Sequence, residues 1–346
     1  MKKLLALCFL LTVSFASFSN SAMPGIWEAG ANGKFVPLFA GDSVFFGKIQ
    51  MQHEQILVNL YPGFAVVKGE YYMYNNTDTA ISMHVAYPKQ ATFSDTLVQH
   101  VIPSYIAGMK VLVNDETTPL MRKEDADFKT MLTSSEAGQV AHDNANAYEN
   151  WFVWKMTFAP KTITKITVYF LTDNSHAHLR RGYSGDDGSA FSYVLESGRA
   201  WGGRIDSGKI CVQLKEGLTT KDIKAVLPYN TLIGDTTHLL YQFTNKEPTE
   251  KDNLLIWYKD VPKDSAFEKK IFPEAAKYYA EIDGFDVAAF SSASFTPLQL
   301  NDFEIHSTNP LTWVLYGALA FGALVLFMII YGVVRWIKRS NRANQR

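Results

Sequence analysis

The sequence has little cysteine, no large excess of either charge and none of the short linear motifs of common enzymes. Two cysteines among 346 residues exclude a small disulfide-stabilised scaffold. A formal net charge of −1 excludes nucleic-acid binding driven by bulk positive charge. An apolar fraction of 47% excludes a disordered chain. We therefore expect a folded protein of about two domains that does not bind nucleic acid.

Catalytic motifs are missing as well. The sequence contains no H-E-x-x-H, Walker loop, G-x-S-x-G elbow or C-x-x-C, and no G-x-G-x-x-G follows a strand pattern. These absences exclude only enzymes that carry such motifs, because residues scattered over several strands leave no linear trace. From the sequence we assign no catalytic residue and no cofactor, and we favour a protein that is not an enzyme.

The N-terminus has the pattern of a signal peptide. In residues 1–22, two lysines precede an apolar run from Leu4 to Phe18, and small residues follow up to Ala22. An N-terminal membrane anchor is the alternative, because Asn20 is not ideal three residues before the cleavage point. The cleavage site itself stays open between Ser21 and Ala22.

The C-terminus has the pattern of a membrane anchor. Residues 311–334 form an uncharged stretch of 24 residues, long enough to cross a bilayer as a helix, with Trp and Tyr at both rims. The tail, residues 335–346, carries five basic residues and no acid, which places it in the cytoplasm by the positive-inside rule. The sequence therefore predicts a single-pass membrane protein whose N-terminal region lies outside the cytoplasm.

The exported part is acidic and has one cysteine. The two ends carry seven of the 33 basic residues and none of the 34 acidic ones, which leaves 26 basic against 34 acidic residues, a net charge of −8, in residues 23–310. Cys211 is the single cysteine there, and a eukaryotic ectodomain of this size usually has several cystines. We therefore expect a bacterial inner-membrane protein with a periplasmic region.

Apolar residues in the exported part mostly alternate with polar ones, which is typical of half-buried strands. Residues 56–60, 65–73 and 81–87 predict an antiparallel meander, and residues 154–158 and 166–170 predict a hairpin. A polar stretch at about 121–148 predicts a helical insertion between them. The fold class is thus all-β, with a first β-sandwich module over residues 23–175.

A charged, turn-rich stretch near residues 173–189 predicts a domain boundary. Four further strand patterns follow and predict a second β-sandwich module over residues 176–284. Residues 264–282 look helical in two pieces broken at Pro273, and the polar residues 285–310 predict a stalk or a last strand pair above the membrane.

Three sites in the sequence have residues that could bind a metal or act as a nucleophile. His176 and His178 lie two residues apart, so in an extended chain both imidazoles, with Asp173 nearby, point to one side and suit a zinc or copper ion. Chance pairing at a surface is the alternative, which Arg180 and Arg181 favour. The segment 186–189 is compatible with calcium but lacks the alternating acids of a calcium loop, so a hairpin turn is expected.

Cys211 is either a nucleophile or a small packing residue, and packing is the usual role of a lone thiol flanked by apolar residues. Aromatic clusters place Tyr72, Tyr74 and Trp151 where they would line an exposed surface for glycan or protein contact, unless both sheet faces are covered.

Spaced motifs resemble those of the bacterial domain-of-unknown-function family 4424. Residues 193–205 (YVLESGRAWGGRI) resemble its strand followed by a Trp-x-Gly-x-Ile turn, and residues 243–256 resemble its Asn-x-Glu-Pro element before a strand. Residues 67–88 resemble a strand, turn and strand of the family, similar to the sandwich of vault and inter-alpha-trypsin domains. The resemblance implies a secreted or anchored β-sandwich protein without assigned catalysis.

Within the first of these motifs the residues look architectural. Gly198, Gly202 and Gly203 fit backbone turns or bulges, Trp201 fits a plug at a sheet edge or domain seam, and Tyr193 lies on the preceding strand.

The leading hypothesis is a non-catalytic periplasmic binding module, tethered to the membrane, with a protein or cell-wall partner. One alternative is an envelope hydrolase or carbohydrate-active protein with a site near Trp201 and Asp186 at the domain seam. The other is a metal-binding protein that uses His176 and His178.

Overall fold

A computed structural model describes most of residues 23–310. The described residues are 25–27, 35–37, 39–45, 47–88, 100–102, 106–122, 151–175, 177–181, 184–195, 198, 201–228, 231–258 and 266–298, with helical residues between 316 and 335. The expected signal peptide and tail, and the expected helical insertion beyond residue 122, lie outside these residues, apart from Arg335.

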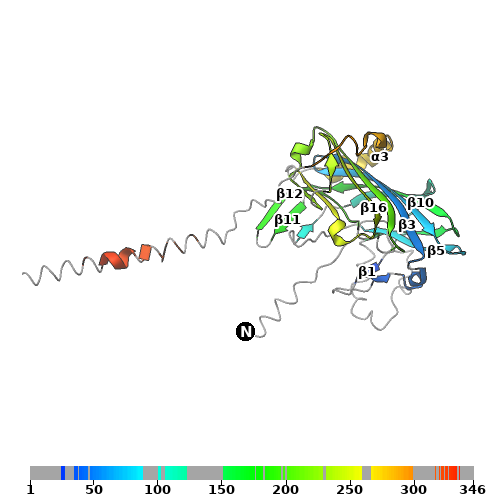
Figure 1. The fold of residues 1–346 in the computed structure, drawn as a ribbon, viewed down its shortest axis with the longest axis horizontal. Helices are drawn as coiled ribbons and strands as arrows, with labels where there is room; N and C mark the ends of the chain where they lie inside the picture. The colour runs from blue at the N-terminus through cyan, green and yellow to red at the C-terminus, as the bar shows by residue number, and fades with distance from the viewer. Residues whose placement is uncertain are drawn as a thin grey trace, which may run out of the picture.

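A nine-stranded sheet forms the main body of the molecule (Figure 1). The order across the sheet is β18-β15-β16-β13-β3-β4-β10-β7-β8, and β13 runs parallel to β3 while the other neighbours are antiparallel. The bounds are β3 (Ile49–Tyr61), β4 (Phe64–Asn75), β7 (Ile106–Val113), β8 (Glu116–Thr118), β10 (Ile163–Asp173), β13 (Ile205–Leu214), β15 (Ile233–Gly234), β16 (His238–Lys246) and β18 (Thr296–Pro297).

Smaller sheets complete the β structure. A five-stranded sheet has the order β14-β17-β12-β11-β6, and β5 pairs with β9 and β1 with β2. The bounds are β1 (Gly25–Trp27), β2 (Phe35–Pro37), β5 (Ile81–Pro88), β6 (His100–Ile102), β9 (Trp151–Phe158), β11 (Ala177–Arg181), β12 (Ser184–Tyr193), β14 (Ala225–Leu227) and β17 (Leu254–Tyr258). The inner face of the nine-stranded sheet shares one buried apolar cluster with β5, β9, β12, β14 and β17. The expectation of a mostly β protein is confirmed.

Strand pairing differs from the sequence expectation in two places. The meander breaks after β4, since β4 lies between β3 and β10, whereas β5 pairs with β9. The expected hairpin of β9 and β10 is absent among the described strands for the same reason. Alternation identifies a half-buried strand but not its partner, and β5 and β9 bury their apolar side chains in the inner core as a separate pair.

The expected boundary between two modules does not coincide with a break in the main sheet. Residues 207–214 of β13 pair with residues 53–60 of β3, so strands from both expected modules share one hydrogen-bonded sheet. Backbone pairing at this separation in sequence depends on the whole chain, and no local pattern reports it.

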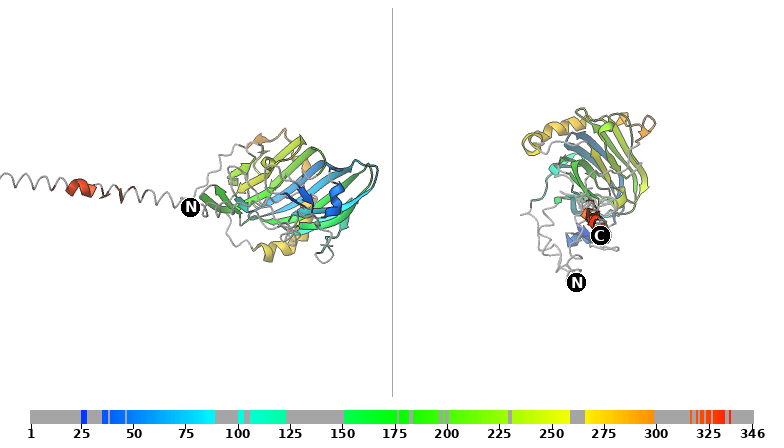
Figure 2. Two further views of the ribbon diagram at one scale, coloured as in Figure 1. Left: turned by 90° about the horizontal axis from the view of Figure 1, so that it is seen from below. Right: turned by 90° about the vertical axis from the view of Figure 1, so that its left-hand side faces the viewer.

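The outer face of the main sheet is partly covered by residues 266–298, here named the covering segment. It contains a π-helical turn (Phe267–Ile271), a 3-10 turn (Phe272–Glu274), the helix α3 (Ala275–Asp283), a second 3-10 turn (Val287–Ala289) and β18. Figure 2 shows α3 lying outside the sheet. The buried side chains of the covering segment share one apolar cluster with residues of β3, β4, β10, β13 and β16, among them Leu57, Cys211 and Leu240.

The covering segment changes one expectation and supports another. The helical interpretation of residues 264–282 is confirmed from Phe267 onward, and Pro273 lies in the 3-10 turn between the π-helical turn and α3. Residues 285–298 do not form a free stalk, because Phe290 and Phe295 are buried against the sheet. The alternative of a last strand agrees with β18, which pairs with β15. The sequence pattern gave these aromatic residues no partner to pack against.

Polar contacts fasten the covering segment to the sheet. The Asp283 carboxylate accepts hydrogen bonds from Lys68 Nζ at 2.8 Å and Tyr169 Oη at 2.7 Å. Partial burial of Asp283 opposes its ionisation, but these two donors hold its pKa below its ordinary value. The contacts therefore hold the covering segment against the sheet at neutral pH.

The C-terminal region is described at scattered positions only. The described residues between 316 and 335 are helical and coloured red in Figure 1. Leu319, Phe321 and Phe327 are 63%, 68% and 67% exposed there. Among the described residues, no helix is long and apolar enough to span a bilayer.

Candidate functional site

The uncovered part of the outer face carries two rows of polar side chains across four neighbouring strands. We name this surface the polar face. Its first row is Thr244, Ser207, His53 and Tyr72, and its second row contains Gln242, Lys209 and Gln55. Each row follows the register of β16, β13, β3 and β4, and side chains two residues apart point to the same face.

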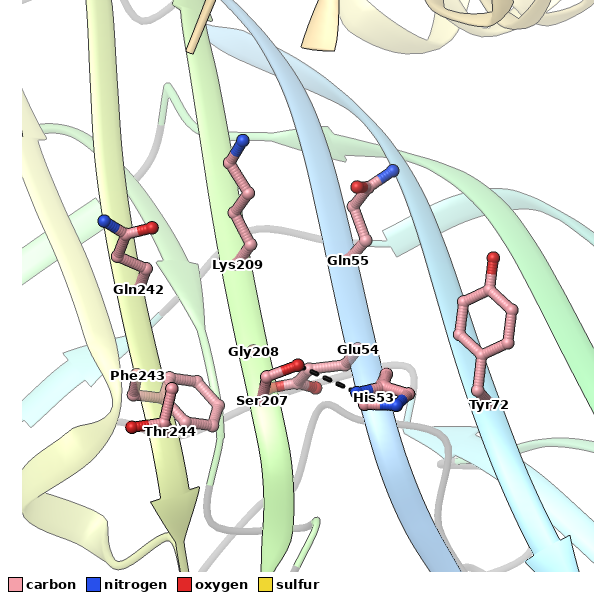
Figure 3. A pocket seen from close by; sticks show the side chains of 10 residues that line it. All are labelled: His53, Glu54, Gln55, Tyr72, Ser207, Gly208, Lys209, Gln242, Phe243 and Thr244. Atoms are coloured by element: carbon pink, nitrogen blue, oxygen red, sulfur yellow. Dashed lines mark hydrogen bonds between the residues drawn. The ribbon is translucent and has the colours of Figure 1, made fainter. Parts of the chain in front are cut away.

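The two rows line an open pocket with a volume of about 630 Å³. Figure 3 shows the polar side chains projecting from their strands, with Phe243 and Gly208 between the rows. Gly208 leaves room for the Phe243 ring, since a Cβ at Gly208 would lie 2.1 Å from Phe243 Cζ. Most of the residues that line the pocket are polar, and the buried Phe243 ring lies beneath them.

The outward-facing side chains change from polar to apolar at the edge of the polar face. The next outward-facing row along the same strands is Leu57, Cys211 and Leu240, and these side chains are buried under the covering segment. Lys209 lies at this edge and donates from Nζ to the backbone carbonyl of Phe290, at 3.1 Å. The polar face is therefore in direct contact with the covering segment.

His53 and Ser207 form the closest polar pair of the site. His53 Nδ1 lies 2.8 Å from Ser207 Oγ. The rings of His53 and Tyr72 form a T-shaped contact, with their centroids 6.3 Å apart. No carboxylate of the described residues hydrogen-bonds His53, and the neighbouring Glu54 is only 3% exposed, on the inner side of the sheet. Among the described residues, His53 and Ser207 therefore lack the carboxylate that would complete a hydrolytic triad.

The charges around the polar face are mostly neutralised, with one exception. Glu70 continues the second row, and its carboxylate lies 3.1 Å from Lys165 Nζ and 3.3 Å from Gln55 Nε2. Lys209, by contrast, has no ion-pair partner within the described part of the chain. The polar face therefore presents a positive charge among amide and hydroxyl groups.

The interaction residues expected from the sequence are distributed between surface and core. Tyr72 lies on the polar face, half-buried, as part of the pocket lining. Trp151, Tyr193 and Trp201 are buried, at 7%, 0% and 4% exposure. The Tyr193 hydroxyl lies 3.0 Å from that of Tyr71, and burial raises the pKa of Tyr193 well above its ordinary value.

The three expected glycines all lie at irregular backbone. Gly198 donates its N–H to Leu195, and Gly202 donates to the Ile49 carbonyl at 2.7 Å. Gly203 has a φ of +75°, which an L side chain rarely adopts. These positions agree with an architectural role next to the start of β3.

The expected metal site is only partly described. Asp173 accepts hydrogen bonds from the backbone N–H and hydroxyl of Ser175, at 3.0 and 2.5 Å. His178 lies in β11, opposite Asp187 of β12, and His176 lies outside the described residues. No cluster of three metal-ligating residues occurs among the described residues, and metal binding stays a prediction.

Cys211 provides a test of the packing. It is fully buried beneath the covering segment, and burial raises the pKa of its thiol to about 12, against a smaller lowering by Lys209. Because the thiolate is the reactive form, we expect Cys211 in the native protein to resist a thiol reagent at pH 8 and to react at once in denaturant. The label is measured by mass spectrometry on the peptide that contains Cys211, and rapid native labelling would contradict this packing.

Sequence reasoning found Tyr72 but missed His53, Ser207 and Gln242. A signal was present, since polar residues alternate at 53 and 55, at 207 and 209, and at 242 and 244. Each alternation alone indicates only a solvated strand face. The site exists because β3 and β13 are parallel neighbours, and that pairing has no local sequence signal.

No protein-family model matches the chain, and no curated protein matches it. Over 61% of its length the chain is similar to the "putative nutrient binding protein" of Legionella pneumophila, with 16% identity, a TM-score of 0.41 and 67% of that chain covered. It is also similar to the M1 zinc metallopeptidase of Deinococcus radiodurans (7% identity, TM-score 0.31, 61% of this chain and 43% of that chain). Yeast LTA4 hydrolase is similar as well, with 9% identity, a TM-score of 0.32, and 61% of this chain and 29% of that chain covered. The chain spans less than half the length of these two enzymes, and these similarities assign no activity to it.

Proposed function

We propose that the protein is a non-catalytic, membrane-anchored binding module of the bacterial envelope, and that its polar face binds a hydroxyl-rich glycan of the cell wall. The observation that carries the proposal is the alignment of two polar rows over an open pocket on four adjacent strands. Amide, hydroxyl and imidazole groups donate and accept hydrogen bonds, as sugar hydroxyls require, and Tyr72 offers an aromatic surface.

Membrane anchoring is the second part of the proposal. The uncharged residues 311–334 and the basic tail support a single crossing with the tail in the cytoplasm. The exposed apolar side chains on the described helical positions, such as Leu319 and Phe327, fit a lipid environment. Residues 1–22 would direct export. A reporter fused after Arg346 is expected to be active only in the cytoplasm, and activity outside the cytoplasm would contradict this topology.

Glycan binding is tested by co-sedimentation of the full chain, in detergent, with insoluble cell-wall glycan. We expect the wild-type protein to sediment with the glycan and Tyr72→Ala and Gln242→Ala each to lower the affinity about fivefold to tenfold, because each removes a contact worth about 1–1.5 kcal/mol. Lys221→Ala, at an exposed site on the 3-10 turn Thr220–Asp222, is the matched control and is expected to sediment like wild type.

The opposite results identify the other functions. Equal sedimentation of the wild type and both polar-face variants would show that the glycan binds elsewhere. Absence of sedimentation would overturn the glycan proposal, and a protein partner would then be the occupant to seek.

A further inference from the structure

The charge on the polar face narrows the class of ligand. We propose that the ligand is a sugar acid, and that its carboxylate is bound by Lys209 while its hydroxyls bind the flanking amide and hydroxyl groups. The inference rests on the proposed function, since it assigns a chemical class to the occupant of the same surface.

The position of Lys209 supports this assignment. Lys209 lies in the second row between Gln242 and Gln55, one on each neighbouring strand. An ammonium has three donors, and one of them meets the Phe290 carbonyl at 3.1 Å. The structure records no carboxylate partner for Lys209 within its described part, so the remaining donors and the charge suit an anionic group from a ligand.

On the outer face of the sheet, the charged groups favour an anion at Lys209 rather than at the β4 end of the row. Glu54, the acid that lines the pocket from below, is buried on the inner side of the sheet. Glu70, at the β4 end of the row, lies 3.1 Å from Lys165 and 3.7 Å from Lys68. A ligand carboxylate would meet a cation at Lys209, whereas at Glu70 it would meet an acid that is already paired. The charged end of the ligand is therefore expected at Lys209.

The neutral members of the polar face complete the match. Gln55 and Gln242 flank Lys209, and His53 and Ser207 lie in the adjacent row on the same two central strands. Amides and hydroxyls pair with hydroxyl groups in either direction, whereas a simple anion leaves most of these groups without a ligand contact. The combination suits a ring that has several hydroxyls and one carboxylate.

Three probes separate the contributions of the ring and the acid. N-acetylmuramic acid has both, N-acetylglucosamine has the ring without the acid, and D-lactate has the acid without the ring. In calorimetric titrations of the full chain in detergent, we expect N-acetylmuramic acid to bind about 10- to 100-fold more tightly than either other probe, because a charge-assisted hydrogen bond is added to the neutral contacts. This difference should shrink as the salt concentration rises.

Variants of Lys209 test the residue itself. Lys209→Gln keeps a donor for the Phe290 carbonyl but removes the charge, so its affinity for N-acetylmuramic acid should fall to that for N-acetylglucosamine. Lys209→Arg should retain the preference, and Lys221→Gln is the control that should leave it unchanged. Thermal unfolding of each variant checks that the fold is kept.

The outcomes distinguish this inference from the proposed function. Equal binding of the acidic and neutral sugars, unchanged in Lys209→Gln, would overturn the assignment of a sugar acid and leave glycan binding intact. D-lactate binding as tightly as N-acetylmuramic acid would show a simple anion site and overturn it as well. Binding of none of the probes, together with no sedimentation on cell-wall glycan, would overturn the proposed function.

Discussion

Ile282→Asp should detach the covering segment from the main sheet and expose Cys211 to solvent. Ile282 is completely buried on α3, in the apolar cluster that also contains Cys211 and Leu240. A carboxylate placed there has no cation to pair with in that apolar cluster, and burying an unpaired charge costs about 3–5 kcal/mol. We expect the labelling rate of Cys211 to rise at least a hundredfold, which follows from that loss if opening of the segment controls access.

An exposed isoleucine provides the control for this experiment. Ile163→Asp makes the same chemical change on β10 at a side chain that is 46% exposed, and it should leave the labelling rate within about twofold of wild type. If Ile282→Asp lowers the free energy of global unfolding by as much as the free energy of opening calculated from the labelling rate, the segment and the sheet unfold together. If labelling stays slow while the variant is folded, the segment does not cover Cys211.

Gly202→Ala should destabilise the protein by about 2–3 kcal/mol, because the space for a Cβ is already occupied by backbone. A Cβ at Gly202 would lie 2.2 Å from the Gly47 carbonyl oxygen, and the Gly202 N–H is bonded to the Ile49 carbonyl, so neither strand end can move away cheaply. The measurement is the free energy of unfolding in denaturant, and loss of the fold would lower the yield of soluble protein.

Substitutions at two other glycines are expected to cost less stability than Gly202→Ala. Gly203→Ala meets no atom within 4 Å but keeps a φ of +75°, so it should cost about 1 kcal/mol. Gly41→Ala meets neither a close atom nor a positive φ, and its effect should stay within about 0.5 kcal/mol. Equal stability of all three variants would contradict the close approach of Gly202 to Gly47.

Local patterns predicted the β class and the positions of nine of the eighteen described strands, because alternation reports burial directly. Leu57, Cys211 and Leu240 show where that information ends. The sequence placed Cys211 on the face opposite Ile210 and Val212, which is correct, but the residues that cover it come from a segment about 70 residues later in the chain. Pairing and covering depend on tertiary packing, whose contributions exceed local propensity.

The candidate site illustrates the same limit. Tyr72 stood out because it belongs to an aromatic cluster, whereas His53 and Ser207 are single polar residues in ordinary strand patterns. They lie 154 positions apart and meet only through the parallel pairing of β13 with β3. Trp201 and Tyr193, which stood out as strongly as Tyr72, are buried in the core.

Side-chain footprinting with and without the glycan tests the polar face most directly. Hydroxyl radicals oxidise accessible histidine and tyrosine side chains, and mass spectrometry of the full chain in detergent reports each residue separately. We predict that N-acetylmuramic acid protects His53 and Tyr72 and leaves Tyr278 on α3 unchanged, since Tyr278 contacts Tyr61 and Phe64 away from the polar face. Oxidation of His53 and Tyr72 at the same rate with saturating sugar bound, or protection confined to another surface, would contradict the polar face as the binding site.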